Sequence, residues 1–268
     1  MTEHEFGGGW TQIKLDVLDR YLSAYTTALK DQHFKLLYID AFAGTGKVTT
    51  KTGNILTGSA GIALNTEGFS HHLFIESDAK RCAALQQLSE DYPQHSIEIK
   101  NGDGNAVLSD FLPRLKAGWR GVCFLDPYGL QLSWETVEMI ANTKAFDVWY
   151  LFPLSGVYRQ AAHDFRKVDA AKAASLDRCL GTTDWREEFY KESTQGDLFD
   201  APATERVANV DAIEGYVKKR LKTLFPAVLQ PKRLYMGKTP IFSLFFAVSN
   251  RPAIPVATRI ADYILSRA

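Results

Sequence analysis

The sequence has few cysteines, no excess of charge of either sign and no long hydrophobic run. Its three cysteines lie far apart and form no C-x-x-C pair, so neither a disulfide framework nor a metal site is expected from them. Basic and acidic residues number 31 each, so bulk charge does not favour a nucleic-acid partner, although a local basic patch still can. The longest apolar run, residues 241–248, is too short to span a bilayer. The N-terminal MTEHEFGGGW lacks the apolar core of a signal peptide, so we expect a cytoplasmic protein with no membrane partner.

The chain does contain a regular alternation of short apolar strands and amphipathic helices. Hydrophobic residues make up 46% of it, which is enough for a large buried core. Strands are predicted at residues 35–40, 72–76, 96–100, 121–126 and 146–152, and a helix is predicted after each of the first four. Five strands that alternate with helices predict a parallel, doubly wound α/β sheet.

Further elements flank this predicted core of residues 35–152. They are a helix at 10–31, a helical insertion at 153–204, a long helix at 205–225, a two-strand hairpin that turns at Gly237 and Lys238, and a last helix at 253–266. The polar stretches 47–54 and 193–203 are predicted to be loops. We expect residues 1–268 to form one domain.

The stretch YIDAFAGTGKVTT, residues 38–50, has the glycines and the lysine of a phosphate-binding loop. A Walker A loop would need glycine at Ala41 and Ser or Thr at Val48, so the hydroxyl that holds Mg²⁺ is missing. In the dinucleotide pattern G-x-G-x-x-G, Gly44 and Gly46 fit, but Thr49 replaces the third glycine and would crowd the following helix. Both nucleotide alternatives therefore match only in part.

A third pattern, D-x-F-A-G-x-G, covers Asp40, Phe42, Gly44 and Gly46. It resembles the S-adenosyl-L-methionine (SAM) loop of class I methyltransferases, in the form shared by N6-adenine methyltransferases. Asp40 ends the first strand, at the ligand-binding edge of such a sheet, and could meet the ammonium of SAM directly or through water. The two glycines would let the backbone approach the methionine end of the ligand without a Cβ clash.

Acidic residues follow the next predicted strands at the same edge. Glu76 follows the second strand, where class I methyltransferases bind the ribose hydroxyls, and Asp103 follows the third, near the adenine. Asp126, Pro127 and Tyr128 follow the fourth strand, where catalytic or target-facing residues are often found. An acid after a strand is also a common helix N-cap, and D-P-Y-G is a good turn sequence. Their order at one edge favours a ligand site.

Over almost its full length the sequence resembles the three-Cys-motif partner proteins. The resemblance rests on W-x-x-I-K-L-x-x-L-x-x-Y-L-x-x-Y at residues 10–25, on YIDAFAGTG, GSAGIAL, FIESD and FLDPYG with its following tryptophan, and on F-x-L-F-F-A-V-S-N. It implies a class I methyltransferase-like, mostly parallel seven-stranded sheet with a helical insertion after strand 5, and SAM as cofactor. It also implies a partner protein with a three-cysteine motif, which is not formed by the cysteines of this chain.

The DPYG turn resembles the [DN]-P-P-[YFW] motif of amino-methyltransferases. In that motif the acid and the first proline carbonyl accept hydrogen bonds from a target amine, and the aromatic residue stacks on the base. Asp126 and Pro127 match, whereas Tyr128 comes one residue early. The first hypothesis is therefore a SAM-dependent methyltransferase that acts on an amine of a DNA or RNA base. The second is a non-catalytic scaffold that uses the same fold to bind the three-cysteine-motif protein.

Three other features are open to two interpretations. Arg159, after the fifth strand, could bind a phosphate or carboxylate, or it could be a surface ion-pair residue. The basic cluster at 218–238 could contact a nucleic-acid backbone, although such clusters are more often the solvated face of a helix. His71 and His72 lack a third ligand nearby, so no metal site is predicted.

Overall fold

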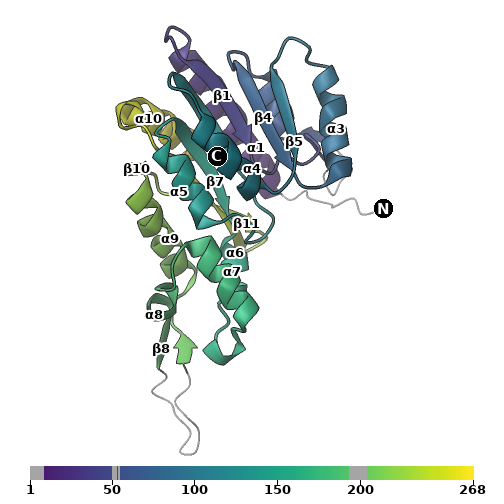
Figure 1. Ribbon diagram of the computed structural model, residues 1–268. Helices are drawn as coiled ribbons and strands as arrows, with labels where there is room; N and C mark the ends of the chain where they lie inside the picture. Colours follow the sequence, from purple (N-terminus) through teal and green to yellow (C-terminus); the bar gives the residue numbers. More distant parts are fainter. Residues whose placement is uncertain (1–8, 50–52, 54, 193–203) are drawn as a thin grey trace, which may run out of the picture.

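The computed structural model describes residues 9–49, 53, 55–192 and 204–268. One mixed sheet runs through its middle (Figure 1), and the five parallel strands of this sheet stand in the order β5, β4, β1, β6, β7. Their bounds are β1 Lys35–Asp40, β4 His71–Glu76, β5 Ile97–Asn101, β6 Trp119–Leu125 and β7 Phe146–Phe152. The antiparallel strand β12 (Thr239–Val248) continues the sheet next to β7. Both β10 (Ala227–Val228) and β11 (Lys232–Met236) pair with β12. The predicted doubly wound, mostly parallel sheet is confirmed.

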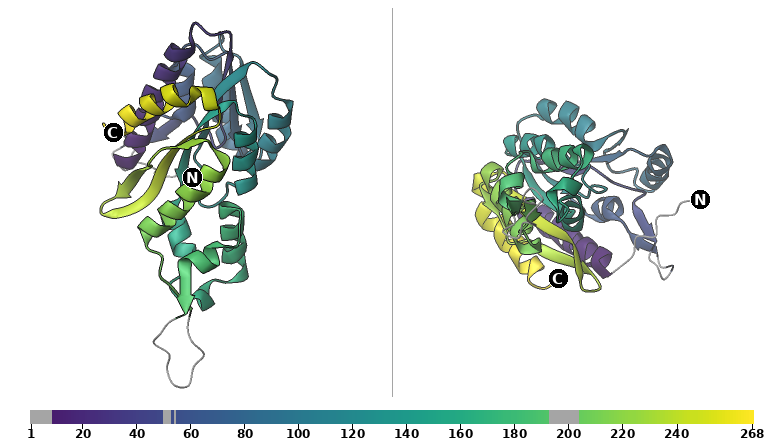
Figure 2. Two further views of the ribbon diagram at one scale, coloured as in Figure 1. Left: turned by 90° about the vertical axis from the view of Figure 1, so that its left-hand side faces the viewer. Right: turned by 90° about the horizontal axis from the view of Figure 1, so that it is seen from below.

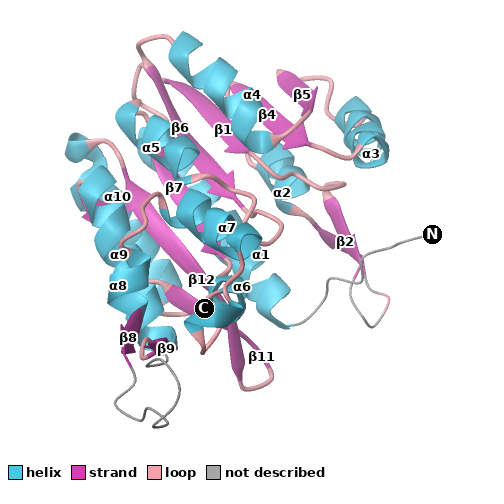
Figure 3. Ribbon diagram, turned by 60° about the horizontal axis from the view of Figure 1, so that its bottom comes forward, coloured by secondary structure: helices cyan, strands magenta, loops and turns pink. Residues whose placement is uncertain are grey.

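Helices cover both faces of the sheet (Figures 2 and 3). One apolar core contains side chains of α1 (Gly9–Leu29), α2 (Ser59–Asn65), α3 (Ala79–Glu90) and α10 (Ile254–Leu265). The other contains side chains of α4 (Gly104–Phe111), α5 (Trp134–Asn142), α6 (Leu154–Gln160), α7 (Ala170–Leu180), α8 (Trp185–Phe189) and α9 (Val210–Leu224). Because side chains alternate along a strand, β1 supplies Leu36 and Tyr38 to the first core and Leu37 and Ile39 to the second. This explains the continuous apolar run KLLYID.

Helix α1 is tied to the sheet by polar contacts as well as by packing. The hydroxyl of Tyr21 donates a hydrogen bond of 2.7 Å to Oδ2 of Asp147 on β7. Asp147 is 4% exposed, and its burial raises the pKa of its carboxyl to about 7. A second polar contact joins α1 to the end of β6, at Lys14 and Asp126. The N-terminal helix is therefore a supporting element of the carboxyl edge of the sheet.

Most predicted elements lie within one or two residues of their observed bounds, with three errors. The long helix was predicted from residue 205 but begins at Val210, because β9 (Thr204–Arg206) pairs with β8 (Tyr190–Glu192). The polar stretch predicted to be a loop at 47–54 contains β2 (Lys47–Thr49), which pairs with β3 (Ile55–Thr57). The two-residue strand β10 was missed. The predicted loop 193–203 and the first eight residues lie outside the described part.

The segment that follows β7 extends beyond the carboxyl edge of the sheet (Figure 1). It holds α6, α7, α8 and β8, which agrees with the helical character predicted for this region. Ser133 is the N-cap of α5, since its side chain accepts from the Thr136 N–H. Within the described residues, no helix combines the length and hydrophobicity that crossing a bilayer requires.

Candidate active site

The strand order brings the predicted site residues to one edge of the sheet. Asp40 at the end of β1 is in register with Phe74 of β4 and Phe124 of β6, and Glu76 is in register with Asn101. Four loops therefore leave the sheet at nearly the same level, after β1, β4, β5 and β6. In doubly wound sheets the ligand binds outside these carboxyl ends.

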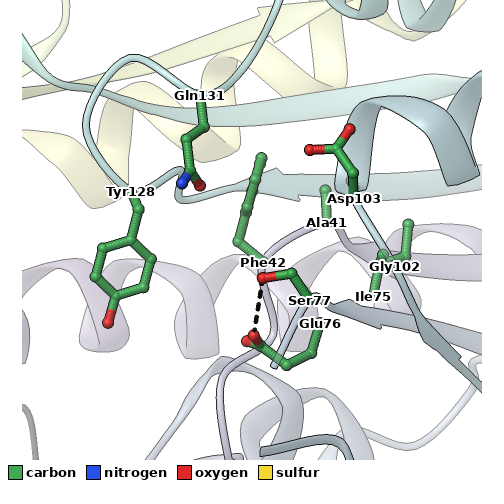
Figure 4. A pocket seen from close by; sticks show the side chains of 10 residues that line it. Ala41, Phe42, Ile75, Glu76, Ser77, Gly102, Asp103, Tyr128 and Gln131 are labelled. Atoms are coloured by element: carbon green, nitrogen blue, oxygen red, sulfur yellow. Dashed lines mark hydrogen bonds between the residues drawn. The ribbon is translucent and has the colours of Figure 1, made fainter. Parts of the chain in front are cut away.

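A small cavity, with room for about one water molecule, lies between these loops. Ala41, Phe42, Ile75, Glu76, Ser77, Gly102, Asp103, Gly104, Tyr128 and Gln131 line it. Figure 4 shows the Phe42 ring in its middle, with Tyr128 and Gln131 on one side and Asp103 on the other. The cavity is therefore much smaller than a typical ligand pocket. Three predicted cofactor residues and one predicted catalytic residue share the cavity: Phe42, Glu76, Asp103 and Tyr128.

Glu76 is buried, and its carboxylate holds the glycine loop in place. Its Oε2 accepts a 3.0 Å hydrogen bond from the Gly44 N–H, and its Oε1 accepts a 2.9 Å bond from the Asp78 N–H. The guanidinium of Arg81 approaches Oε1 at 3.4 Å. Glu76 thus joins the loop after β1 to the start of α3 while it lines the cavity.

Asp103 is the N-cap of α4. Its Oδ1 accepts from the N–H groups of Asn105 and Ala106 at 3.0 and 3.1 Å. Both bonds use Oδ1, so the side chain can still accept through Oδ2. A Cβ on the next residue, Gly104, would lie 2.7 Å from the Ala41 carbonyl oxygen and 3.3 Å from the Phe42 ring. The N-cap and the ligand-facing interpretations of Asp103 are therefore compatible, and Gly104 allows the two loops to approach closely.

Asp40 lies beneath the cavity and has no exposed surface. Its Oδ1 accepts from the Phe42 N–H at 3.3 Å, and its Oδ2 accepts from the Tyr38 hydroxyl at 3.4 Å. Burial raises the pKa of this carboxyl to about 7, while a hydrogen bond from Ser59 opposes the rise. A direct contact of Asp40 with a ligand would therefore require the loop after β1 to move.

The two predicted cofactor glycines differ in their surroundings. Gly44 has a φ of +62°, and a Cβ there would meet no atom within 4 Å, so this part of the loop is open. Gly46 has a φ of +72°, but a Cβ there would lie 2.4 Å from Leu88 Cδ2 of α3. Only Gly44 has the open approach that was predicted for both, because Gly46 is turned into apolar packing.

The acceptor-side residues follow β6. Pro127 is buried, and Asp126 forms an ion pair with Lys14 of α1. The Lys14 side chain is 10% exposed and that of Asp126 is 24% exposed, so the pair is largely shielded from water. The Lys14 ammonium also lies 5.3 Å from the centre of the Trp10 ring. The carboxylate that was predicted to face a target amine therefore has a cation of the same chain as its present partner.

Tyr128 lines the cavity rather than a separate acceptor pocket. Arg81 Nη1 donates a 3.2 Å hydrogen bond to the Tyr128 hydroxyl, and the guanidinium carbon lies 5.3 Å from the ring centre. Since Arg81 also contacts Glu76, one side chain spans two walls of the cavity. Tyr128 was predicted to face the acceptor, and the structure places it also against the proposed cofactor residues.

The structure also shows where Arg159 and the basic cluster at 218–238 lie, the two features whose roles the sequence left open. Arg159 is an exposed residue of α6. Within the basic cluster at 218–238, Arg233 pairs with Glu214 and Asp211, and Arg220 donates to backbone carbonyls of Leu180 and Gly181. These partners make the cluster less available to a phosphate backbone than the sequence suggests.

No group of three or more histidine, cysteine or acidic side chains among the described residues is placed to hold a metal ion. Cys82, Cys123 and Cys179 are buried free thiols. Burial raises the pKa of the Cys179 thiol to about 12, which makes it unreactive. His72 is also buried, and this lowers the pKa of its imidazole to about 4.

Three residues of the site were missed from the sequence. Lys14 had a readable signal, because it stands on the buried stripe of α1 between Trp10 and Val17, where a charge needs a partner. No signal of this kind in the sequence indicated Arg81 or Asn105. Asn105 accepts from the Ser133 N–H at 2.9 Å and donates to the Gln131 carbonyl at 2.9 Å, so it fixes the loop after β6.

The sequence matches no protein-family model and no curated protein. Among solved structures, the Legionella pneumophila protein LPL1258 is similar at a TM-score of 0.56 and 12% identity, over 97% of this chain and 92% of its own. Trm1 from Pyrococcus horikoshii with S-adenosyl-L-methionine gives 0.47 at 11% identity, over 97% of this chain and 58% of its own. Spermidine synthase from Thermotoga maritima gives 0.43 at 12% identity, over 90% of this chain and 60% of its own.

Such identities concern the fold alone, and TM-scores below 0.5 do not establish it by themselves. The chain has a class I methyltransferase-like α/β fold, with a mostly parallel central sheet and helices on both faces. Membership of the three-Cys-motif partner family is not shown by any of these likenesses.

Proposed function

We propose that this class I methyltransferase-like chain binds SAM and transfers its methyl group to an amine of a nucleic-acid base. The observation that carries the proposal is the cavity itself, because Phe42, Glu76 and Asp103 meet there from three consecutive loops. Carboxylates suit both the ribose hydroxyls and the adenine amino group. The cytoplasmic location expected from the sequence is part of the proposal.

The donor residues fit SAM in chemistry, and the cavity must widen to admit it. Glu76 would accept hydrogen bonds from the ribose, and Asp103 would accept through Oδ2 near the adenine. Gly44 offers open backbone where the methionine end would lie. Arg81 and Tyr128, which close one side of the cavity, are the side chains whose displacement would enlarge it.

When bound, SAM supplies a methyl group on a positively charged sulfur. The protein's part is to hold the amine in line with it and to accept hydrogen bonds from its N–H groups. Asp126 and the Pro127 carbonyl stand at the end of β6 for this role, by resemblance to the amino-methyltransferase motif. Accepting those hydrogen bonds raises the electron density on the nitrogen that attacks the methyl carbon.

The test of donor binding is calorimetric titration of the full chain with SAM, S-adenosylhomocysteine, ATP and NAD. We expect micromolar binding of the two adenosyl sulfur compounds and none of the other two. Binding of ATP alone would support the Walker A alternative despite Ala41 and Val48. Binding of none of the four would contradict the donor site.

One observation favours a non-catalytic second candidate, in which the fold is a scaffold for a three-cysteine-motif protein. The two functional carboxylates, Glu76 and Asp126, both contact cations of the chain, Arg81 and Lys14. Co-purification with such a protein, with and without SAM, tests this candidate. A stable complex without methyl transfer to DNA or RNA would favour the scaffold.

Arg81 gives a further prediction about the donor site. Because it contacts Glu76 where a ribose would bind, we expect Arg81→Met to strengthen S-adenosylhomocysteine binding about threefold, the size of a weak, partly exposed ion pair. Calorimetry on this variant and on Lys80→Met, a neighbouring exposed residue of α3, makes the comparison. Weaker binding in Arg81→Met would mean that Arg81 holds the ligand instead of competing with it.

A further inference from the structure

Three charged side chains from three elements meet under the carboxyl edge. Lys14 comes from α1, Asp40 from the end of β1, and Asp126 from the end of β6. Asp40 is fully buried, Lys14 is 8% exposed, and the Asp126 side chain is 24% exposed. Lys14 therefore pairs directly with the acid proposed for the acceptor side, Asp126, and also interacts electrostatically with the acid proposed for the donor side, Asp40.

A buried lysine needs a reason. Burial of an ammonium costs several kcal/mol unless an anion compensates it. Trp10 offers its ring face to Lys14, and Asp126 offers a carboxylate oxygen. The neighbouring positions of this face of α1, such as Val17, Leu18 and Tyr21, are filled by apolar packing, as expected of a helix on a sheet. A methionine would pack equally well at this position, so we infer that the positive charge of Lys14 is needed for its interaction with the acids.

Among the described residues, the other groups that contact Asp40 or act on it carry no positive charge. Its neighbours are the hydroxyls of Tyr38 and Ser59, the Phe42 N–H and the buried thiol of Cys123. Asp126 raises the pKa of Asp40 and Lys14 lowers it, in addition to the larger effect of burial. Lys14 thus pairs with Asp126, and its charge also acts on Asp40.

We propose that Lys14 is a positioning residue that fixes the Asp126 carboxylate at the acceptor side and balances, with one ammonium, the paired charges of Asp126 and Asp40. It holds Asp126 from the side of α1 through their ion pair. Its charge also opposes the repulsion between the two acids. The donor side and the acceptor side of the proposed active site are thereby coupled electrostatically. This inference rests on the proposed function for the roles of the two acids, while the cluster itself does not depend on it.

The experiment is a carbon-13 NMR titration of the Asp40 carboxyl in the full chain, with the signal assigned by Asp40→Asn. In the wild type the midpoint is expected near the pKa of about 7 that burial gives this carboxyl. Lys14→Met should raise the midpoint by about one pH unit, and Asp126→Asn should lower it by a similar amount. Lys14→Arg should keep it close to the wild-type value. The double variant should lie between the two single variants.

Opposite shifts are a result that a merely structural role of Lys14 would not give. An unchanged midpoint in either Lys14→Met or Asp126→Asn would overturn the proposal, as would shifts of the same sign. If Lys14→Met fails to fold by near-ultraviolet circular dichroism, Lys14→Arg and Asp126→Asn decide: an unmoved midpoint in Asp126→Asn rejects it. Titration of the same samples with SAM tests the proposed function separately. A wild type that does not bind SAM would remove the proposed function, while the Asp40 midpoints would still test the charge cluster.

Discussion

Glu76→Gln is expected to weaken SAM binding about 100-fold, while the protein remains folded. The variant keeps the shape of the side chain but loses its charge. Glu76 has two tasks in the site, since it would receive the ribose hydroxyls and it holds the glycine loop through the Gly44 N–H at 3.0 Å. Hydrogen bonds to a charged acceptor contribute about 1.5–3 kcal/mol each, so the loss of one or two of them accounts for this change.

The measurement is calorimetric titration of Glu76→Gln with SAM and S-adenosylhomocysteine, beside thermal unfolding of the same samples. Glu67→Gln is a suitable control, because Glu67 is an exposed acid in the turn before β4. It should bind like the wild type. Unchanged affinity in Glu76→Gln would remove the ribose assignment, since no other acid of the cavity lies at the end of β4.

The backbone arrangement could be predicted from the sequence to a large extent. Strands β1 and β7 were placed correctly at both ends, because each is a compact apolar run bounded by polar or turn residues. The hairpin of β11 and β12 followed from the glycine at its turn. The errors concern short strands such as β2 and β9, whose largely polar sequences pair only because of the surrounding fold.

The site was predicted less completely, and the reason is also physical. Residue types at the ends of strands indicated Glu76 and Asp103, which line one cavity as expected. Side-chain partners contributed by distant elements cannot be inferred from local patterns. Arg81 is joined to Tyr128 across 47 positions, and Lys14 to Asp126 across 112. The burial of Asp40, which keeps it out of the cavity wall, likewise depends on packing by several elements.

The second large effect is expected from replacing Asp126, the carboxylate proposed to face the methyl acceptor. We expect Asp126→Asn to lower the rate of methyl transfer on the order of 100-fold or more, with donor affinity close to that of the wild type. Asparagine can accept one hydrogen bond from an amine but cannot compensate the charge that develops on nitrogen. Asp126 does not line the donor cavity, so its replacement should affect kcat much more than SAM binding.

Transfer is measured in single-turnover reactions with methyl-tritiated SAM and unmethylated RNA and DNA made in vitro, and donor affinity by calorimetry. Glu135→Gln changes an exposed acid in the first turn of α5 and serves as the control. Full transfer by Asp126→Asn or Asp126→Ala would remove the acceptor assignment.

The free energy of unfolding separates a structural role of Asp126 from a catalytic one in the variants Asp126→Asn and Asp126→Ala. Either one leaves the Lys14 ammonium largely buried without its anion, and we expect Asp126→Ala to cost about 3 kcal/mol in the free energy of unfolding. Adding Lys14→Met removes the unpaired charge and should restore most of that stability. It should not restore transfer, because the carboxylate that accepts the amine hydrogens is still absent. Recovery of stability and transfer together in the double variant would mean that Asp126 is needed only to hold α1 against the sheet.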